Sequence, residues 1–406
     1  MRNNVEHLLS RFKGDGPYLY IDNAKLIDAA SGTFNLPLGY TNERITNKLS
    51  AQLARGAHLS SAYTLEMAQS ILGRLLPYAP AGFTNIWLRD VTGSGAVECA
   101  IRMAQKATGR SGVMSLYMSH HGQSLATAQI SGNAFRIKDF HVEITGSVKI
   151  PVPPSVLANQ IGDRDLHEFA DLDSLFEFGL TQNIACVIVE PVLGNGGNIV
   201  IPKAFYSHLN KFCRRNNIVI VADEVQTGFG RTGTFFASTG YARDLDPDII
   251  VFAKGAGGIG IPTGGVLMRK ELDVLESFEH SSTSGANPLS LIAMNETISI
   301  IEDEDLLGRV TENQDFILNG LIDIQSRHSS VSGVRGLGYM FGFDTPSPEF
   351  AKQFIDLAHK NGLIIRGSRY GKSSALKVRP PLICTRVHIE EILQKIDLTL
   401  NQISAQ

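Results

Sequence analysis

Short apolar runs alternate with amphipathic stretches through the middle of the chain. Five apolar runs have the length and composition of buried strands, and they span residues 86–91, 112–118, 185–192, 218–222 and 248–253. Between them, apolar residues recur at the spacing of a helix face over residues 96–107 and 205–216. Strands that alternate with helices in this way predict an α/β fold, with a mainly parallel sheet covered by helices.

The C-terminal part of the chain follows a different pattern. A helical pattern starts at Pro288 and runs towards Ile301, and mixed helix and strand patterns continue to the end after a polar break. Glycine-rich segments at residues 333–342 and 367–374 indicate turns. We therefore predict a large domain over residues 51–299, a smaller α+β domain over 300–406, and an N-terminal segment, residues 1–50, that joins the small domain.

The composition is that of an ordinary soluble globular protein, with 43% hydrophobic and 19% charged residues over 406 positions. A net charge of −3 without a long basic run gives no support for nucleic-acid binding. Residues 1–16 lack the apolar core of a signal peptide, and no stretch approaches the roughly 20 apolar residues that span a bilayer. The four cysteines form no CxxC pair, which argues against a zinc site and fits a reducing compartment. We therefore expect a cytoplasmic protein without a nucleic-acid, membrane or metal partner.

Two segments of the chain partly match known nucleotide-binding motifs. Residues 255–260 match GxGxxG after a strand, but the following residues 261–265 contain Pro262 and two glycines instead of the helix that would hold a pyrophosphate. We expect a mobile loop there. Residues 367–373 are one residue short of a phosphate-binding GxxxxGK[ST] loop, and no helix pattern follows them. The sequence therefore favours neither a dinucleotide nor a nucleoside triphosphate.

Three other features follow one another along the chain and suit a single cofactor. The turn Thr92-Gly93-Ser94-Gly95-Ala96 lies between a strand and a helix, where glycines allow close backbone approach and the helix start favours an anion. Asp223 ends an apolar strand, at the sheet edge where ligands bind in open α/β folds, and a buried carboxylate needs a cationic partner. Lys254 ends the next strand. A lysine in apolar surroundings has a lowered pKa, and its neutral amine can form an imine.

Each of these features also has an ordinary explanation when it is taken alone. The glycines suit any tight strand-to-helix turn, Asp223 suits a salt bridge or a helix cap, and Lys254 suits a solvated strand end. Their joint occurrence favours pyridoxal 5′-phosphate (PLP). The turn would hold its phosphate, Asp223 would pair with its protonated pyridine nitrogen, and Lys254 would carry it as a Schiff base.

From Tyr18 to Leu382 the chain resembles the class III (omega-type) aminotransferases, which adopt PLP fold type I. The strongest match is the stretch Ala222-Asp-Glu-Val-Gln-Thr-Gly-Phe-Gly-Arg-Thr-Gly233. Lys254-Gly255 and the later Ser282-Thr283-x-x-x-Asn287-Pro288-Leu289 match as well. The resemblance implies a large domain with a seven-stranded, mainly parallel sheet, a smaller α+β domain, and an assembly that is at least a homodimer.

The resemblance also implies a set of cofactor contacts. Lys254 would bind the cofactor covalently and move protons, and Asp223 would bind the pyridine nitrogen. Val225 would pack under the ring, and Gln226 would lie near its phenolic oxygen. Thr283 would reach the phosphate of the cofactor in a neighbouring subunit. The remaining contacts would come from Gly93, Ser94, His120 and Glu190.

Two departures from the family pattern concern the cofactor side. The family usually has an aromatic residue stacked on the ring, followed by His or Trp and then Gly, whereas this chain reads His120-His121-Gly122. Because an imidazole can also stack on the ring, we assign that position to His120. Gly95 stands where the phosphate loop of the family often carries a glutamate.

The residues expected to contact the substrate differ more strongly from the family pattern. Relatives that use glutamate often pair a gating Glu in an EPxxGE segment with an Arg before Pro-Pro-Leu. Here the segment runs from Glu190 to Asn195, so that Asn195 replaces the gating residue, and Lys377 replaces the Arg. Arg379 lies two residues further on. These three residues, Asn195, Lys377 and Arg379, are the candidate substrate contacts, and the familiar glutamate switch is not expected.

The predicted function is amino transfer between an amine or amino acid and an oxo acid by a ping-pong mechanism. The cofactor residues alone do not select this outcome. The alternatives are another class III activity, such as an amino-acid epimerase, decarboxylating transaminase, aminomutase or phospho-lyase, or a non-catalytic PLP-binding protein. Formation of an oxo product in stoichiometric amounts separates transamination from epimerisation, and the presence of both Lys254 and Asp223 argues against mere binding.

Overall fold

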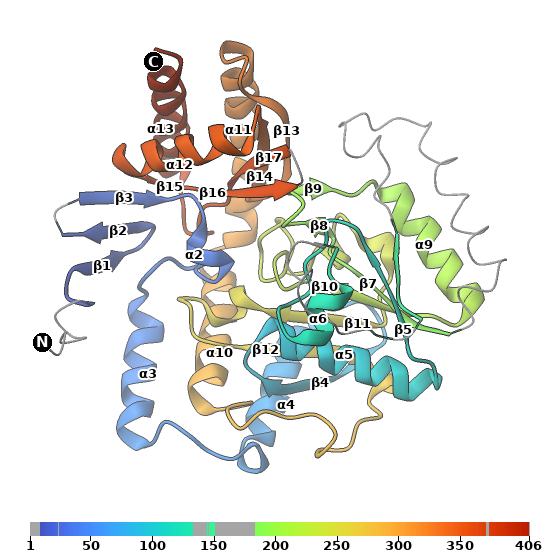
Figure 1. Cartoon of the computed structure of the whole chain (residues 1–406). Coiled ribbons are helices and arrows are strands. Elements are labelled where there is room, and N and C mark those ends of the chain that lie inside the picture. The colour runs from blue at the N-terminus through green and yellow to red at the C-terminus, as the bar shows by residue number, and fades with distance from the viewer. Residues whose placement is uncertain are drawn as a thin grey trace, which may run out of the picture.

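The computed structural model describes residues 9–22, 24–132, 144, 146–150, 183–370 and 373–405. It has a large body built around one sheet, with a smaller lobe formed by the C-terminal helices and strands above it (Figure 1). Among the described residues, no helix is long and apolar enough to cross a membrane.

The large body is built on a seven-stranded sheet with the order β4-β12-β11-β10-β7-β5-β6. The strands are β4 (Phe83–Asp90), β5 (Gly112–Leu116), β6 (Val148–Ile150), β7 (Ile184–Val189), β10 (Val219–Asp223), β11 (Ile249–Ala253) and β12 (Gly264–Arg269). Strand β12 runs antiparallel to both of its neighbours, and the other paired strands run parallel. The prediction of a mainly parallel sheet is confirmed.

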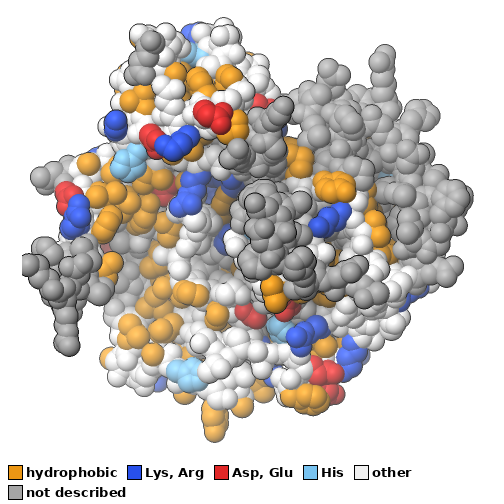
Figure 2. Space-filling view, in the orientation of Figure 1, with side chains coloured by type: hydrophobic (Ala, Val, Ile, Leu, Met, Phe, Trp, Pro, Cys, Tyr) orange, Lys and Arg blue, Asp and Glu red, His pale blue; other side chains and the backbone are white. Residues whose placement is uncertain are grey.

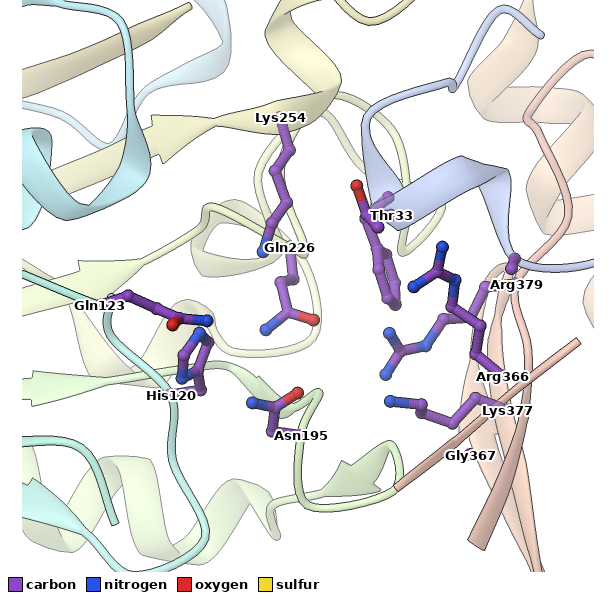
Figure 3. Close-up of a pocket in the computed structure, with 12 residues that line it drawn as sticks. Thr33, His120, Gln123, Asn195, Gln226, Lys254, Arg366, Gly367, Lys377 and Arg379 are labelled. Carbon is purple, nitrogen blue, oxygen red and sulfur yellow. The ribbon is translucent and has the colours of Figure 1, made fainter. Parts of the chain in front are cut away.

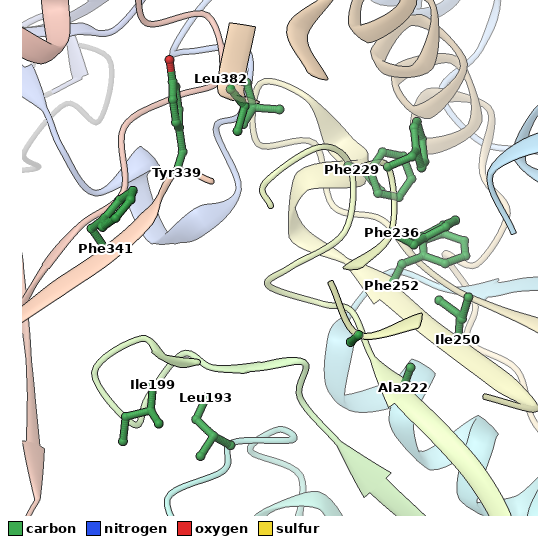
Figure 4. Packing of buried hydrophobic residues seen from close by; sticks show 14 of the residues in the cluster. Leu193, Ile199, Ala222, Phe229, Phe236, Ile250, Phe252, Tyr339, Phe341 and Leu382 are labelled. Atoms are coloured by element: carbon green, nitrogen blue, oxygen red, sulfur yellow. The ribbon is translucent and has the colours of Figure 1, made fainter. Parts of the chain in front are cut away.

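Helices cover both faces of this sheet. Those that contact its strands are α4 (Leu65–Leu75), α5 (Gly93–Thr108), α6 (Leu125–Ile130) and α9 (Lys203–Asn216). Helix α10 (Pro288–Asp303) packs against α4, and α3 (Glu43–Arg55) packs against α10. Successive residues of β11 enter different cores, since Ile250 and Phe252 pack in one cluster and Ile249 and Val251 in the other. Burial on both faces explains why the central strands are apolar throughout instead of alternating. Figure 4 shows part of the first cluster, where Phe229 and Phe236 pack beside Phe252.

The smaller lobe contains a second sheet with the order β13-β14-β17-β16. Its elements are α11 (Leu306–Arg327), β13 (Ser332–Leu337), β14 (Met340–Thr345), α12 (Pro348–Lys360), β16 (Arg366–Tyr370), β17 (Ser373–Val378) and α13 (Arg386–Ser404). The prediction of a turn within residues 333–342 is confirmed at residues 338–339, which join β13 to β14, while the flanking residues are held as strands by cross-strand pairing. In the segment 367–374, residues 367–370 and 373–374 belong to the paired strands β16 and β17. Residues 371–372 lie outside the described part.

The N-terminal strands belong to a third sheet that includes a C-terminal strand. Strands β1 (Phe12–Asp15), β2 (Tyr18–Ile21) and β3 (Ala24–Asp28) pair antiparallel, and β3 pairs in parallel with β15 (Leu363–Ile364). The short helix α2 (Ser31–Phe34) then leads towards the large body. The domain limits given above stay a prediction, and the limit at residue 300 falls inside α10.

Candidate active site

Three connections meet at one edge of the central sheet. Asp223 is the last residue of β10, and Lys254 directly follows the neighbouring parallel strand β11. In the next strand, Gly264 lies opposite both Ala253 and Asp90, so the end of β4 reaches the same edge. The turn into α5 therefore starts beside the acid and the lysine, where open α/β sheets bind ligands.

The turn into α5 is held by side chains that accept backbone hydrogen bonds. Thr92 caps the helix, since its Oγ1 accepts the Gly95 N–H at 3.0 Å. Oδ1 of Asp90 accepts the N–H groups of Val91 and Thr92 at 2.7 and 3.0 Å. A Cβ at residue 95 would lie 1.9 Å from Oδ2 of Asp90. The carboxylate of Asp90 thus fills the space that a glutamate at position 95 would need, which explains this departure from the family.

Lys254 sits in an unusual backbone conformation, with φ of +38°, at the start of the 3₁₀ helix Lys254–Gly257. Burial lowers the pKa of Lys254 to about 8, although the nearby carboxylates of Asp223 and Glu190 act in the opposite direction. About a tenth of the amine is therefore neutral at pH 7. The expected loop after Lys254 starts as this 3₁₀ helix, and residues 255–258 are buried. Its mobility stays a prediction.

Both carboxylate oxygens of Asp223 are engaged. Oδ1 accepts the Val225 N–H at 3.1 Å, and Oδ2 lies 2.7 Å from Nδ1 of His121. Because an ionised carboxylate only accepts, Nδ1 is the donor when Asp223 is charged. Both side chains are buried. The sequence reasoning assigned no role to His121. Its position next to His120, in the His-His-Gly segment, was the feature that could have indicated one.

Glu190 connects three further parts of the site. Its Oε1 accepts the backbone N–H of His120 at 2.7 Å, and Oε2 accepts Nε2 of Gln226 at 3.0 Å and the N–H of Gly194 at 3.2 Å. A Cβ at residue 194 would lie 2.2 Å from Oε1 of Gln226, so a larger residue there would displace the end of the Gln226 side chain. Glu190 therefore holds the orientation of Gln226 and of the segment that carries His120.

The buried position of Glu190 predicts a dependence of stability on pH. Burial raises the pKa of Glu190 to about 7 from its ordinary 4.5, with His121 acting to lower it. The stabilisation that the protonated form provides is complete below pH 4.5 and is lost as the pH rises through about 7. Between pH 5 and 7.5, the wild-type protein should lose about 2 kcal/mol of stability relative to Glu190→Gln, because one pKa unit corresponds to about 1.4 kcal/mol.

Denaturant unfolding of the cofactor-free proteins at the two pH values measures this difference. The Gln variant serves as the reference, because the two proteins share every titrating group that lies away from Glu190. Identical pH dependence in both proteins would show that Glu190 ionises normally.

A cavity of about 340 Å³ opens between the sheet edge and the smaller lobe (Figure 3). It is lined by Ala30, Thr33, Phe34, His120, Gln123, Asn195, Gln226, Lys254, Arg366, Gly367, Lys377 and Arg379. The three candidate substrate residues thus share one cavity with Lys254. Phe34, Gln123 and Arg366 were missed by the sequence reasoning, and they come from segments that only the fold brings together.

The other predicted residues do not line the cavity. Val225 packs against Gly93, where a Cβ would lie 3.1 Å from its methyl group. Oγ of Ser94 accepts the Gln123 N–H at 3.0 Å, which ties the phosphate turn to the segment after His120. Thr283 is exposed elsewhere on the surface. The expectation that it reaches a second subunit stays a prediction.

The donor set fits PLP. The amine of Lys254 lies in the cavity, the buried carboxylate of Asp223 lies at the same sheet edge, and the first turn of the 16-residue helix α5 offers an anion site between them and β4. When bound, PLP supplies an electron sink for the charge left on a substrate carbon that loses a proton.

Comparison with known proteins agrees with this fit. The family model for class III aminotransferases matches residues 1–400. The 5-aminovalerate aminotransferase DavT of Pseudomonas aeruginosa is 31% identical over 366 residues, covering 85% of this chain and 82% of its own length. The alanine/serine racemase of Pyrococcus horikoshii is 29% identical over 405 residues, covering 95% and 84%. The PLP-bound amine transaminase of an uncultivated Pseudomonas species superposes with a TM-score of 0.86, at 25% identity and with 96% and 94% coverage.

The fold and the cofactor residues define an enzyme of PLP fold type I. Within that class, the chain belongs to the class III aminotransferases, and it is a PLP-dependent transaminase. The predictions of the family, the fold class, the activity and the cofactor are therefore confirmed.

Proposed function

We propose that the protein transfers an amino group from an amine or amino acid to an oxo acid in two half-reactions at the cavity that contains Lys254. The observation that carries this proposal is the position of the Lys254 amine. It lies in the cavity, has a pKa of about 8, and directly follows the strand next to the one that ends at Asp223. Such an amine can bind a carbonyl group and can also exchange a proton with a substrate carbon.

The surrounding residues would hold the cofactor around this amine. Asp223, fixed by His121 and the Val225 N–H, would keep the pyridine nitrogen protonated. Gly93 and Ser94 would hold the phosphate at the start of α5, where the helix dipole favours an anion. The close contact between Gly93 and Val225 supports a role for Val225 beneath the ring.

His120 and Gln226 would contact the ring from the side of Glu190. The backbone of His120 and the amide of Gln226 both donate to this carboxylate, so their positions are coupled. The imidazole of His120 would then stack on the ring, and Gln226 would lie near its phenolic oxygen.

We also propose that the active unit is a homodimer in the cytoplasm. The exposure of Thr283 supports this assembly, because a residue on the surface of one subunit is available to a cofactor in another.

The test of the reaction is a stoichiometric half-reaction. The holoenzyme, mixed with an excess of an amino donor and no acceptor, should form about one equivalent of oxo product per active site and then stop, because the cofactor retains the amino group. Addition of an oxo acid should restore activity. Since one of the relatives is an alanine/serine racemase, chiral analysis of the remaining donor is run in parallel. Loss of optical activity without any oxo product would refute transamination.

A further inference from the structure

The carboxylate of Asp90 is the central contact of the turn that leads from β4 into α5. Its Oδ1 accepts the N–H groups of Val91 and Thr92, and it also accepts the hydroxyl of Thr92 at 3.1 Å. The same hydroxyl oxygen accepts the Gly95 N–H and so caps the helix. The cap of α5 therefore depends on Asp90 through Thr92.

These contacts decide which N–H groups at the helix start are left for an anion. Three of them donate to the side chains of Asp90 and Thr92, and the Ala96 N–H donates to the Thr92 carbonyl at 3.1 Å. In the described part of the chain, this leaves the N–H groups of Gly93 and Ser94 for a ligand. They are the two groups that would hold the cofactor phosphate.

His280 approaches the same carboxylate from a distant segment of the chain. Its Nε2 lies 3.4 Å from Oδ2 of Asp90, and both side chains are largely buried. Although burial acts to raise it, the pKa of Asp90 is lowered, because His280 and the N–H groups of the turn stabilise the ionised form. Asp90 is thus contacted on both oxygens, by the turn on one side and by His280 on the other.

The segment that carries His280 is fixed to the same two elements. The carbonyl of Glu279 accepts Nη1 of Arg102 on α5 at 2.5 Å. Figure 2 shows acidic and basic side chains side by side on the surface over α5. The Ser282 N–H donates to the carbonyl of Arg89, at the end of β4, at 3.0 Å. His280 is therefore held between α5 and β4, the two elements that the turn joins.

Gly95 and Asp90 are matched to each other in space. A Cβ at residue 95 would lie 1.9 Å from Oδ2 and 2.2 Å from Cγ of Asp90, and its three nearest atoms all belong to this carboxylate. A side chain at residue 95 would therefore displace the carboxylate from the turn. The contact can be broken from either of the two positions.

On the basis of the proposed aminotransferase function, with the cofactor phosphate at the start of α5, we propose that Asp90 and His280 are positioning residues for that phosphate. Asp90 holds the turn so that the N–H groups of Gly93 and Ser94 stay available, and His280 fixes the carboxylate from the other side. The carboxylate at the turn comes from β4 in this chain, whereas relatives often carry one at position 95 in α5.

The test compares PLP with pyridoxal, which lacks only the phosphate. Equilibrium dialysis gives the two dissociation constants for the full-length protein after removal of its cofactor. The wild type should bind PLP at least about 100-fold more tightly, because hydrogen bonds to a charged group are the strong ones. Asp90→Ala should lose at least about tenfold in affinity for PLP and keep its affinity for pyridoxal, since the altered turn contacts only the phosphate. Simple repulsion predicts the opposite sign, because loss of a negative charge near the phosphate would strengthen PLP binding.

Two conservative variants separate the shape of the turn from its charge. Asp90→Asn keeps an oxygen that accepts the N–H groups of the turn, and it should bind PLP within about threefold of the wild type. Asp273→Asn is the matched control. Asp273 is exposed and accepts the Asn85 side chain at the other end of β4, so its change should leave both dissociation constants as they are.

Two further variants approach Asp90 from its neighbours. His280→Ala should weaken PLP binding, and its combination with Asp90→Ala should bind PLP no more weakly than Asp90→Ala alone, because His280 acts through Asp90. If Asp90→Ala does not fold, Gly95→Ala takes its place. Its Cβ displaces the carboxylate, so the affinity for PLP should fall at least about tenfold while that for pyridoxal is kept.

The outcomes distinguish this role from the function on which it rests. Equal or tighter PLP binding by Asp90→Ala would overturn the positioning role. Equal losses of affinity for PLP and pyridoxal would overturn it as well, since they would show a general structural role. A wild-type protein that binds PLP and pyridoxal equally would instead refute the placement of the phosphate at α5, and with it the proposed arrangement of the cofactor.

Discussion

Replacing Lys254 by alanine should lower the rate of amino transfer by more than about 10⁴-fold, because the variant loses both a nucleophile and an acid–base group. The burial that lowers the pKa of Lys254 to about 8 is what makes its amine reactive near neutral pH. Lys377 lines the same cavity, but it projects from β17 in the smaller lobe, on a different wall from Lys254 (Figure 3). It is therefore not placed to replace the lost amine.

Single-turnover formation of the oxo product measures this effect, and equilibrium dialysis measures the retained cofactor. The variant should still bind PLP without a covalent link, since Asp223 and the helix start at Gly93 are unchanged. Lys270→Ala is the matched control, because Lys270 is exposed just after β12 and lies outside the cavity. A Lys254→Ala enzyme that keeps a rate within about tenfold of the wild type would contradict both assigned roles.

The strands of the large body were predictable because of their burial. Strands β7, β10 and β11 are covered on both faces, so every residue in them except the terminal Asp223 is apolar, and the runs stand out without any alternation. The hairpin of β16 and β17 was not predictable in the same way. Its small and polar residues, such as Gly367 and Ser374, favour turns locally, and the pairing with β14 that makes them strands comes from a segment about 30 residues away.

The residues of the candidate site also differ in whether the local sequence predicts them. Asp223 and Lys254 were found because each ends an apolar run, so their position could be read from the local sequence. The partner of Asp223, His121, lies 102 residues earlier in the chain, and its contact depends on how the two segments are folded together. Arg366 was missed for a similar reason, since its place beside Lys377 follows from strand register alone. Reactive residues at strand ends are thus easier to predict than the distant residues that contact them.

Asp223→Asn should lower kcat by about 100- to 1,000-fold, the range seen when one fixed electrostatic contact to a developing charge is removed. The amide has nearly the same shape as the carboxylate, and its oxygen still accepts either the Val225 N–H or the His121 N–H. What it lacks is the negative charge that would hold a proton on the pyridine nitrogen. The loss should therefore appear in the proton-abstraction step, with a smaller change in KM.

His121 separates this charge effect from a structural one. His121→Gln keeps a donor near Asp223 and should cost less than Asp223→Asn, because the carboxylate remains ionised behind the ring. If His121 acts through Asp223, the double variant should be about as slow as Asp223→Asn alone, whereas independent roles would multiply. Deuterium substitution at the reacting carbon of the donor reports the affected step, since slower proton removal raises the isotope effect. A full-rate Asp223→Asn enzyme would show that the charge of Asp223 does not serve the reaction.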